Sequence, residues 1–223
     1  MKSITLRKKL LCSAKLYFVL DIDTVLKPPL YIVKKLLKDR CVDIIQLRDK
    51  TDPKKKIYKL AVAIKKILDK SDILFIINDY IDIAESIGAD GLHIGQNDLP
   101  LPLVKRLLGK DKIVGVSCHS LEEAKEAEKE KADYISIGPV FFSPLKPDYK
   151  AIGINTLKLL KDRVSIPYFA IGGIDLSNMD KLISMKIDRF AFSRLIGRRK
   201  NISQTIMQLK ERFYKNDPER ICA

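Results

Sequence analysis

The chain lacks tryptophan and has only two histidines and four cysteines among its 223 residues. None of the cysteines forms a C-x-x-C pair, and no histidine lies at zinc-ligand spacing from them. This pattern argues against a structural zinc site and against a disulfide framework. We therefore expect reduced thiols and a cytoplasmic protein. The scarcity of histidine also leaves no Ser-His-Asp pattern for nucleophilic catalysis.

Long apolar runs are missing as well. No run approaches the roughly 18 apolar residues of a transmembrane helix, so we expect no membrane span. The N-terminus is basic and then apolar, but its apolar part carries Lys15, Asp21 and Asp23 and no A-x-A cleavage site. That composition argues against a secretory leader. Residues 1–14 are therefore predicted to be a basic extension ahead of the first strand.

The formal net charge of +14 raises the question of a nucleic-acid partner. Lysine and arginine are spread over every expected helix, with dense clusters only at 7–9, 54–56 and 198–200. No helix-turn-helix, RNA-recognition or zinc-finger signature accompanies them. We expect no nucleic-acid partner, since a lysine-rich proteome or a polyanionic small substrate explains the charge at least as well.

Eight apolar runs alternate with helical patterns along the chain. The expected strands are 16–20, 42–47, 73–77, 91–94, 113–116, 134–137, 167–171 and 189–192. The expected helices are 29–39, 54–69, 80–87, 100–108, 120–130, 154–162, 176–185 and 201–214. This regular alternation without a linker predicts an α/β fold, a single-domain (βα)8 TIM barrel over 15–216, with a C-terminal tail at 217–223. A doubly wound sheet fits less well, because the turn after the first strand has no glycine.

Two carboxylates follow neighbouring strands in the stretch 75–100. Asp79 comes directly after the third strand and Asp98 shortly after the fourth. Because parallel barrel strands end on one rim, these side chains are expected to converge there. Paired carboxylates suit Mg²⁺, which commonly binds one or two carboxylates together with substrate phosphates. Helix capping is the alternative role of both residues.

Other strand ends carry groups that suit anions. Gly172 and Gly173 follow the seventh strand and Ser193 the eighth, where barrels often bind phosphate through backbone N–H groups. A second anionic locus is predicted beside the expected metal, where the positive charges are those of Arg48, Lys50 and Lys146.

Six motifs, in order along the chain, resemble those of the thiamine phosphate synthase family of (βα)8 barrels. They are Gln46-Leu-Arg-Asp-Lys50, Ile77-Asn-Asp79, Gly91-Leu-His-Ile-Gly-Gln-Asn-Asp98, Gly115-Val-Ser-Cys-His119, Gly138-Pro-Val-Phe and Ile171-Gly-Gly-Ile174. Together they extend over about residues 15–214. The family is a transferase that joins 4-amino-2-methyl-5-hydroxymethylpyrimidine diphosphate to a thiazole phosphate, giving thiamine phosphate and pyrophosphate.

The resemblance implies a role for each matching residue. Asp79 and Asp98 would bind Mg²⁺, and catalysis would rest on Arg48, Lys50, Ser117 and Lys146. The residues that would contact the pyrimidine diphosphate are Gln46, Arg48, Lys50, Asn78, Ser117 and Lys146. Those that would hold the thiazole phosphate are Ser143, Leu145, Gly173, Phe192 and Ser193. Such a site works by positioning and electrostatic stabilisation of a leaving pyrophosphate rather than by a strong general base.

The chain departs from the family pattern in three places. Leu145 stands where a second threonine is usual and cannot donate a hydrogen bond. Asp49 replaces the usual glutamate. Phe192 and Arg194 occupy the end of the last strand, where small apolar residues are usual. We hypothesise that Arg194 compensates for the lost hydroxyl by binding phosphate.

Two other functions remain open on the sequence alone. The fold resembles that of a sister branch of thiazole tautomerases, for which His119 would be the acid–base residue. His93 is interpreted as structural, and Cys118 beside His119 as a poor candidate nucleophile, since neighbouring strand residues point apart. A non-catalytic barrel that binds a phosphate ligand is the second alternative. The sequence leaves a homo-oligomer open.

Overall fold

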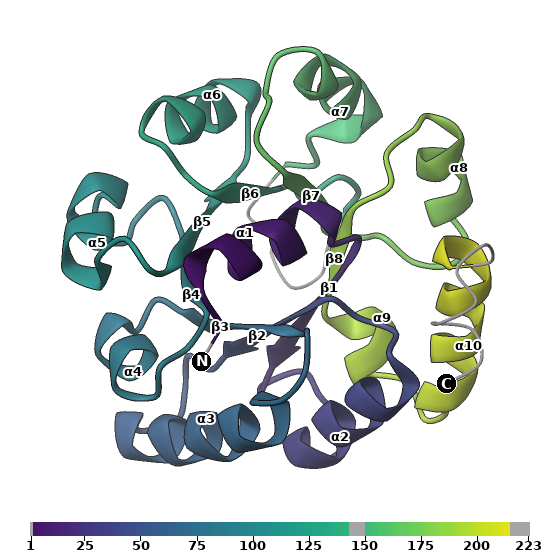
Figure 1. Ribbon diagram of the computed structural model, residues 1–223. Coiled ribbons are helices and arrows are strands. Elements are labelled where there is room, and N and C mark those ends of the chain that lie inside the picture. Colours follow the sequence, from purple (N-terminus) through teal and green to yellow (C-terminus); the bar gives the residue numbers. More distant parts are fainter. Residues whose placement is uncertain (1, 143–149, 215–223) are drawn as a thin grey trace.

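A computed structural model describes residues 2–142 and 150–214. Eight parallel strands form a closed barrel in which each pairs with its neighbours in chain order and β8 pairs with β1 (Figure 1). The strands are β1 (Leu16–Asp21), β2 (Ile44–Arg48), β3 (Leu74–Asn78), β4 (Gly91–Ile94), β5 (Ile113–Cys118), β6 (Tyr134–Ile137), β7 (Tyr168–Ile171) and β8 (Phe190–Phe192). The predicted TIM barrel is confirmed.

Helices surround the barrel, as Figure 1 shows. The eight that the sequence predicted are α2 (Pro29–Asp39), α3 (Lys54–Leu68), α4 (Ile81–Ser86), α5 (Leu101–Leu108), α6 (Leu121–Lys129), α7 (Gly153–Lys161), α8 (Met179–Ser184) and α10 (Ile202–Phe213). Their bounds agree with the expected ones to within about three residues. None of the described helices combines the length and the apolar character that crossing a bilayer requires.

Two described helices were not predicted, α1 (Ile4–Ser13) and α9 (Arg194–Gly197). Ser3 begins α1 by accepting a hydrogen bond from the backbone N–H of Leu6 at 3.2 Å. The helix lies across the N-terminal mouth of the barrel (Figure 1), where Leu11 packs with interior side chains such as Tyr17. The segment expected to be a basic extension therefore closes the floor of the barrel.

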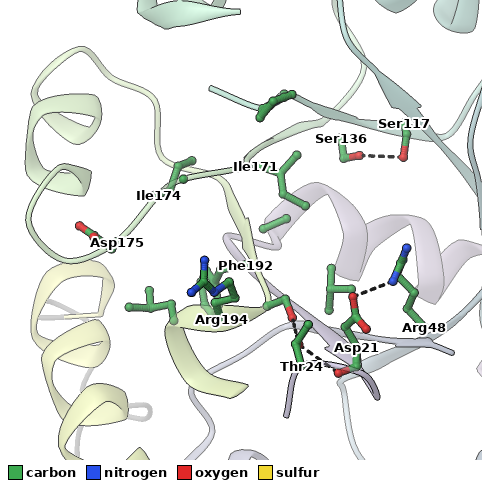
Figure 2. A pocket seen from close by; sticks show the side chains of 18 of the residues that line it. Asp21, Thr24, Arg48, Ser117, Ser136, Ile171, Ile174, Asp175, Phe192 and Arg194 are labelled. Carbon is green, nitrogen blue, oxygen red and sulfur yellow. Dashed lines mark hydrogen bonds and ion pairs between the residues drawn. The ribbon is translucent and has the colours of Figure 1, made fainter. Parts of the chain in front are cut away.

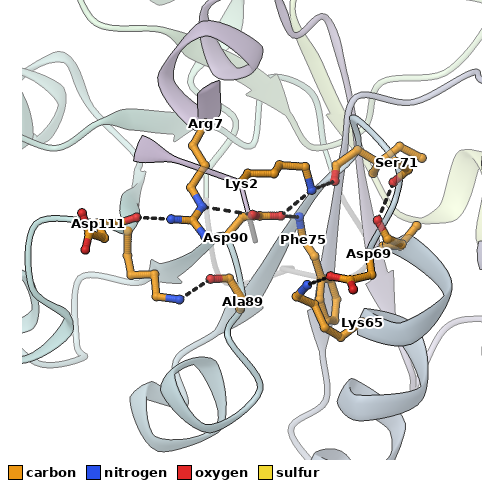
Figure 3. Close-up of polar contacts among 12 residues, drawn as sticks. Lys2, Arg7, Lys65, Asp69, Ser71, Phe75, Ala89, Asp90 and Asp111 are labelled. Atoms are coloured by element: carbon orange, nitrogen blue, oxygen red, sulfur yellow. Dashed lines mark hydrogen bonds and ion pairs between the residues drawn. The ribbon is translucent and has the colours of Figure 1, made fainter. Parts of the chain in front are cut away.

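A buried ion cluster fixes α1 to that floor (Figure 3). Asp90, the residue just before β4, accepts hydrogen bonds from Arg7 Nε at 3.0 Å, Lys2 Nζ at 3.1 Å and the Phe75 N–H at 3.0 Å. Arg7 also donates to the carbonyl of Asp111. The side chains of Arg7 and Asp90 are 4% and 3% exposed, so each buried charge has its counter-charge and hydrogen-bond partners in place.

Candidate active site

A cavity of about 730 Å³ opens at the C-terminal ends of the strands (Figure 2). It lies at the rim opposite the mouth that α1 covers, where function collects in this fold. Five of the predicted binding residues line it, namely Arg48, Ser117, Gly173, Phe192 and Ser193. The structure thus gathers side chains from β2, β5 and β8 and from the loop after β7 around one space.

The Gly172-Gly173 turn shapes one wall of the cavity. Both residues have positive φ, 93° and 65°, which favours glycine. A Cβ on Gly173 would lie 2.6 Å from the Phe142 carbonyl oxygen, so a side chain there would collide with the loop after β6. Nearby, the hydroxyls of Ser193 and Thr24 lie 3.0 Å apart. Small residues and hydroxyls together leave an open, polar surface suited to an anion.

On the wall formed by β1 and β2, Arg48 pairs with Asp21 at 2.7 Å (Figure 2). Burial raises the pKa of Asp21 above its ordinary value, and Arg48 offsets only part of that effect. Arg48 and this partly compensated carboxyl group both line the cavity. Asp21 was not predicted, although its place at the end of the first strand would have identified it by the rule used for the other strands.

The two predicted metal ligands form a separate acidic pair beyond β3 and β4. Asp79 has a left-handed backbone, φ 59°, and pairs with Lys50. Burial raises the pKa of Asp79; Lys50 opposes the shift, and the neighbouring Asp98 carboxylate adds to it. Asp98 accepts a hydrogen bond from the Gly95 N–H at 2.7 Å. Two neighbouring carboxylates, one of them paired with the Lys50 ammonium group, provide oxygen ligands that a divalent cation fits.

Among residues 2–142 and 150–214, no group of three or more histidine, cysteine or acidic side chains is placed to hold a metal. The Asp79–Asp98 pair therefore offers two ligands, and substrate oxygens or water would complete the coordination of a Mg²⁺ ion. Neither residue lines the cavity wall itself, whose described residues include Arg48 and Ser117. The pair adjoins this wall through Gln96, which donates to the Ser117 carbonyl at 2.6 Å.

Gln46 and Asn78 are buried, at 3% and 9% exposed. Gln46 Nε2 donates to the Tyr17 hydroxyl at 2.7 Å inside the barrel. Asn78 ends β3 and lies in register with His93 on β4. Ser143, Leu145 and Lys146 lie outside the described residues.

The two histidines occupy different places. His119 lines the cavity, and its Nδ1 lies 3.2 Å from Glu123 Oε2. His93 points into the barrel, with Nε2 at 2.9 Å from the Ser117 hydroxyl. The sequence interpretation of His93 as structural did not include this contact with a predicted site residue. Burial, with a smaller contribution from Glu123, raises the pKa of the Cys118 thiol to about 12, which makes this thiol a poor nucleophile.

Known proteins are similar to the chain over most of its length. A family model described as thiamine monophosphate synthase matches residues 16–196. The thiamine-phosphate synthase of Shouchella clausii is 50% identical over 143 residues, which are 64% of this chain and 68% of that protein. That of Clostridium tetani is 41% identical over 187 residues, 82% and 88% of the two chains.

A solved structure supports the same relationship. The thiamine phosphate pyrophosphorylase from Pyrococcus furiosus superposes with a TM-score of 0.82 and 31% identity, covering 94% of this chain and 98% of that one. Family model, sequence relatives and structure agree, and the chain belongs to the thiamine monophosphate synthase family.

Proposed function

We propose that this protein is a transferase that couples an aminopyrimidine diphosphate to a thiazole phosphate, giving thiamine phosphate and pyrophosphate. Relatives named thiamine-phosphate synthase support the reaction. In this chain the proposal rests on cations and carboxylates that lie in pairs at one rim of the barrel. Arg48 and Lys50 lie there, each beside a carboxylate whose pKa is raised by burial.

The chemistry begins with departure of the diphosphate from the pyrimidine methylene carbon. The C–O bond breaks with its electron pair on pyrophosphate, and the electron-rich aminopyrimidine stabilises the cation that remains. The thiazole nitrogen then forms the new C–N bond. No strong base is needed, so the protein contributes positive charge at the leaving oxygens and holds two rings in line.

We assign the leaving group to the side of the rim formed by β2 to β4. Arg48 and Lys50 would bind diphosphate oxygens, together with Lys146 from the loop after β6. Asp79 and Asp98 would hold Mg²⁺, which neutralises the charge on a leaving diphosphate when bound. In the present structure Lys50 pairs with Asp79. Binding of a cation and a diphosphate would replace that pair with interactions to the substrate.

The pyrimidine ring would be held by Gln46, Asn78 and Ser117. The thiazole phosphate is assigned to the opposite wall, around Gly173, Phe192 and Ser193, with Ser143 and Leu145 contributing from the loop after β6. Arg194 begins α9 and lines the same cavity. Its position supports the hypothesis that it adds a cation for this phosphate.

A direct assay tests the proposal. Purified protein is mixed with the pyrimidine diphosphate, thiazole phosphate and Mg²⁺, and thiamine phosphate is measured by fluorescence after oxidation to thiochrome. We expect turnover that disappears with EDTA and in Asp98→Ala. The control is Asp72→Ala, which removes an exposed carboxylate before β3 and should retain wild-type turnover. Absence of turnover in the wild type would contradict the proposal.

The alternatives give different outcomes in the same preparation. His119 lines the cavity beside Glu123, so isomerisation of a thiazole carboxylate phosphate is measured as well. Isomerisation blocked by His119→Ala, without coupling, would assign a tautomerase. Phosphate binding without either reaction would indicate a non-catalytic barrel.

The thiols of Cys12, Cys41 and Cys118 are free, which supports the expected cytoplasmic location.

A further inference from the structure

A chain of polar side chains runs through the barrel interior, where apolar side chains usually fill the space. Gln46 Nε2 donates to the Tyr17 hydroxyl at 2.7 Å, and the hydroxyls of Tyr17 and Tyr134 lie 2.9 Å apart. The Tyr134 hydroxyl is 3.1 Å from His93 Nδ1, and His93 Nε2 is 2.9 Å from Ser117 Oγ. Both ends of this chain, Gln46 and Ser117, are residues that the proposed function assigns to the pyrimidine ring.

The sequence provides room for this arrangement. Tyr17 and Tyr134 are 1% and 0% exposed, and their rings pack against each other and against Phe169. A Cβ on Gly115 would overlap the ring of Tyr134, so glycine at this position of β5 is what admits the tyrosine. Burial raises the pKa of both phenols, so each keeps its hydrogen and must place it on an acceptor.

The direction of the hydrogen bonds follows from Gln46. The amide nitrogen of Gln46 donates to the Tyr17 hydroxyl, so the hydrogen of that hydroxyl must go to its other partner, the oxygen of Tyr134. The Tyr134 hydroxyl in turn donates its own hydrogen to His93 Nδ1. A neutral imidazole that accepts at Nδ1 carries its hydrogen on Nε2. That N–H then donates to Ser117 Oγ at 2.9 Å, the shorter of its two contacts, since Ser136 Oγ lies 3.3 Å from the same nitrogen.

Ser117 therefore accepts from inside the barrel. Ser136 lies on the same side, 3.5 Å from Ser117 Oγ, and the contact is drawn in Figure 2. With its oxygen engaged by His93, the Ser117 hydroxyl has its own hydrogen left to donate into the cavity that it lines. At the other end of the chain, no side chain among the described residues donates to the carbonyl oxygen of Gln46, which leaves it as an acceptor.

We propose that Tyr17, Tyr134 and His93 are positioning residues that hold Ser117 as a donor and Gln46 as an acceptor, and thereby select an aminopyrimidine. An aminopyrimidine presents an amino donor beside a ring-nitrogen acceptor, which complements this pair. A 4-oxo-pyrimidine presents the reverse order, and fitting it requires every hydrogen bond from Gln46 to Ser117 to turn around. The inference rests on the proposed function, because it concerns the ring of that substrate.

The first test needs no turnover. The chain has two histidines, so long-range ¹H–¹⁵N correlation spectra of protein with ¹⁵N-labelled histidine contain two rings, and His119→Asn assigns them. We expect His93 as a single tautomer with hydrogen on Nε2. In Tyr134→Phe, which keeps the ring and removes the donor to Nδ1, the tautomer should become mixed. A wild-type His93 with its hydrogen on Nδ1 would overturn the proposal.

The second test measures selectivity. Tyr134→Phe is expected to lower kcat with the aminopyrimidine diphosphate. It should also lower, by about tenfold, the ratio of kcat/KM for the aminopyrimidine to kcat/KM for its 4-oxo analogue, because a hydroxyl or amide turned the wrong way leaves buried polar groups unpaired. The KM for thiazole phosphate should stay unchanged. Tyr168→Phe is the matched control on β7, where the tyrosine is half-buried, and it should alter neither quantity. Unchanged selectivity in Tyr134→Phe would contradict the proposal.

The two tests separate this inference from the proposed function. A fixed Nε2–H tautomer without turnover would retain the hydrogen-bond chain and contradict the synthase. Turnover together with an Nδ1–H tautomer would support the synthase and contradict the hydrogen-bond chain.

Discussion

The two ends of the barrel carry similar acid–base pairs with opposite properties. At the floor, burial acts to raise the pKa of Asp90, but Lys2, the Phe75 N–H and Arg7 outweigh it, and the pKa falls below its ordinary value. At the rim, burial also raises the pKa of Asp79, and there Lys50 is outweighed, with Asp98 adding to the rise. The cations and N–H groups around the floor carboxylate outweigh its burial, whereas at the rim the ammonium group of Lys50 offsets the burial of Asp79 only in part.

The difference indicates what each end is for. A buried charge with complete hydrogen bonding stabilises one arrangement, here the docking of α1 beneath the strands. A pair of carboxylates with incomplete compensation gains from a cation that arrives with the substrate. Conservative changes at the two ends should therefore affect different quantities, activity at the rim and stability at the floor.

The largest effect is expected from Asp79→Asn. Loss of one predicted metal ligand should lower kcat by about a thousandfold, because charge on the leaving diphosphate is then poorly neutralised. The melting temperature should stay close to that of the wild type, since the removed charge is already disfavoured by burial. Asp82→Asn, an exposed carboxylate on α4, is the control and should alter neither value. A stable, fully active Asp79→Asn variant would contradict the assignment of activity to the rim carboxylates.

Asp90→Asn should produce the converse result. It leaves the buried Arg7 and the neighbouring Lys2 without their carboxylate, and we expect the free energy of unfolding to fall by about 3 kcal/mol in urea titrations. Turnover measured well below the melting temperature should stay within about twofold of the wild type. Asp69→Asn removes an exposed carboxylate beside Lys65 and is the control, which should leave the free energy of unfolding close to that of the wild type.

The floor cluster should also make stability depend on pH in acid. A pKa that is lowered in the folded state gives stability that is present above the unfolded value of 3.8 and is lost as the pH falls through the folded pKa. Wild-type stability should therefore drop below about pH 4 in part because of Asp90. In Asp90→Asn this part of the pH dependence should be absent from denaturation curves. An identical acid profile in the two proteins would contradict the role given to the floor cluster.

Gly173→Ala tests the rim without changing charge. A Cβ there meets the Phe142 carbonyl oxygen at 2.6 Å, so the wall of the thiazole phosphate site has to shift, and the KM for that substrate should rise about tenfold. Gly109→Ala is the matched control, because Gly109 also has positive φ, 70°, but no atom within 4 Å of the added Cβ. Both variants should lose about 1 kcal/mol of stability, and only the first should lose substrate affinity.

The smallest effect is expected from Arg194→Ala. Removal of this cavity-lining cation should weaken thiazole phosphate binding by a few-fold, because Gly173 and Ser193 still provide hydrogen-bond donors. Binding of the pyrimidine diphosphate should be unaffected. Unchanged affinity for thiazole phosphate in calorimetry would contradict the compensation hypothesis for Leu145.

Much of the fold and of the rim could be predicted from local pattern. The strands are continuous apolar runs because both faces of a parallel barrel sheet are covered. Since parallel strand ends share one rim, residues such as Arg48 and Gly173 could be grouped from their positions in the sequence. The α1 helix was missed because its apolar residues do not gather on one helical face. Its docking also depends on a distant partner, Asp90, which sequence spacing does not identify.

The side-chain contacts inside the barrel could not be predicted from sequence patterns either. His93 was expected to be structural because alternation along a strand does not say which face holds a polar partner. Its contacts with Tyr134 and Ser117 join three different strands. Asp49, which replaces the usual glutamate, has its Oδ1 engaged by the N–H groups of Thr51 and Asp52, an interaction within its own turn.

The most direct measurement is calorimetric titration of inorganic pyrophosphate into the wild type, Asp79→Asn and Asp90→Asn, each with and without Mg²⁺. Pyrophosphate carries the leaving-group charge and needs no reaction to be detected. We predict Mg²⁺-dependent binding to the wild type and to Asp90→Asn, and its loss in Asp79→Asn. Equal binding by all three proteins, or binding by the wild type that is indifferent to Mg²⁺, would contradict the distinction between a rim that recruits a cation and a floor that holds the fold.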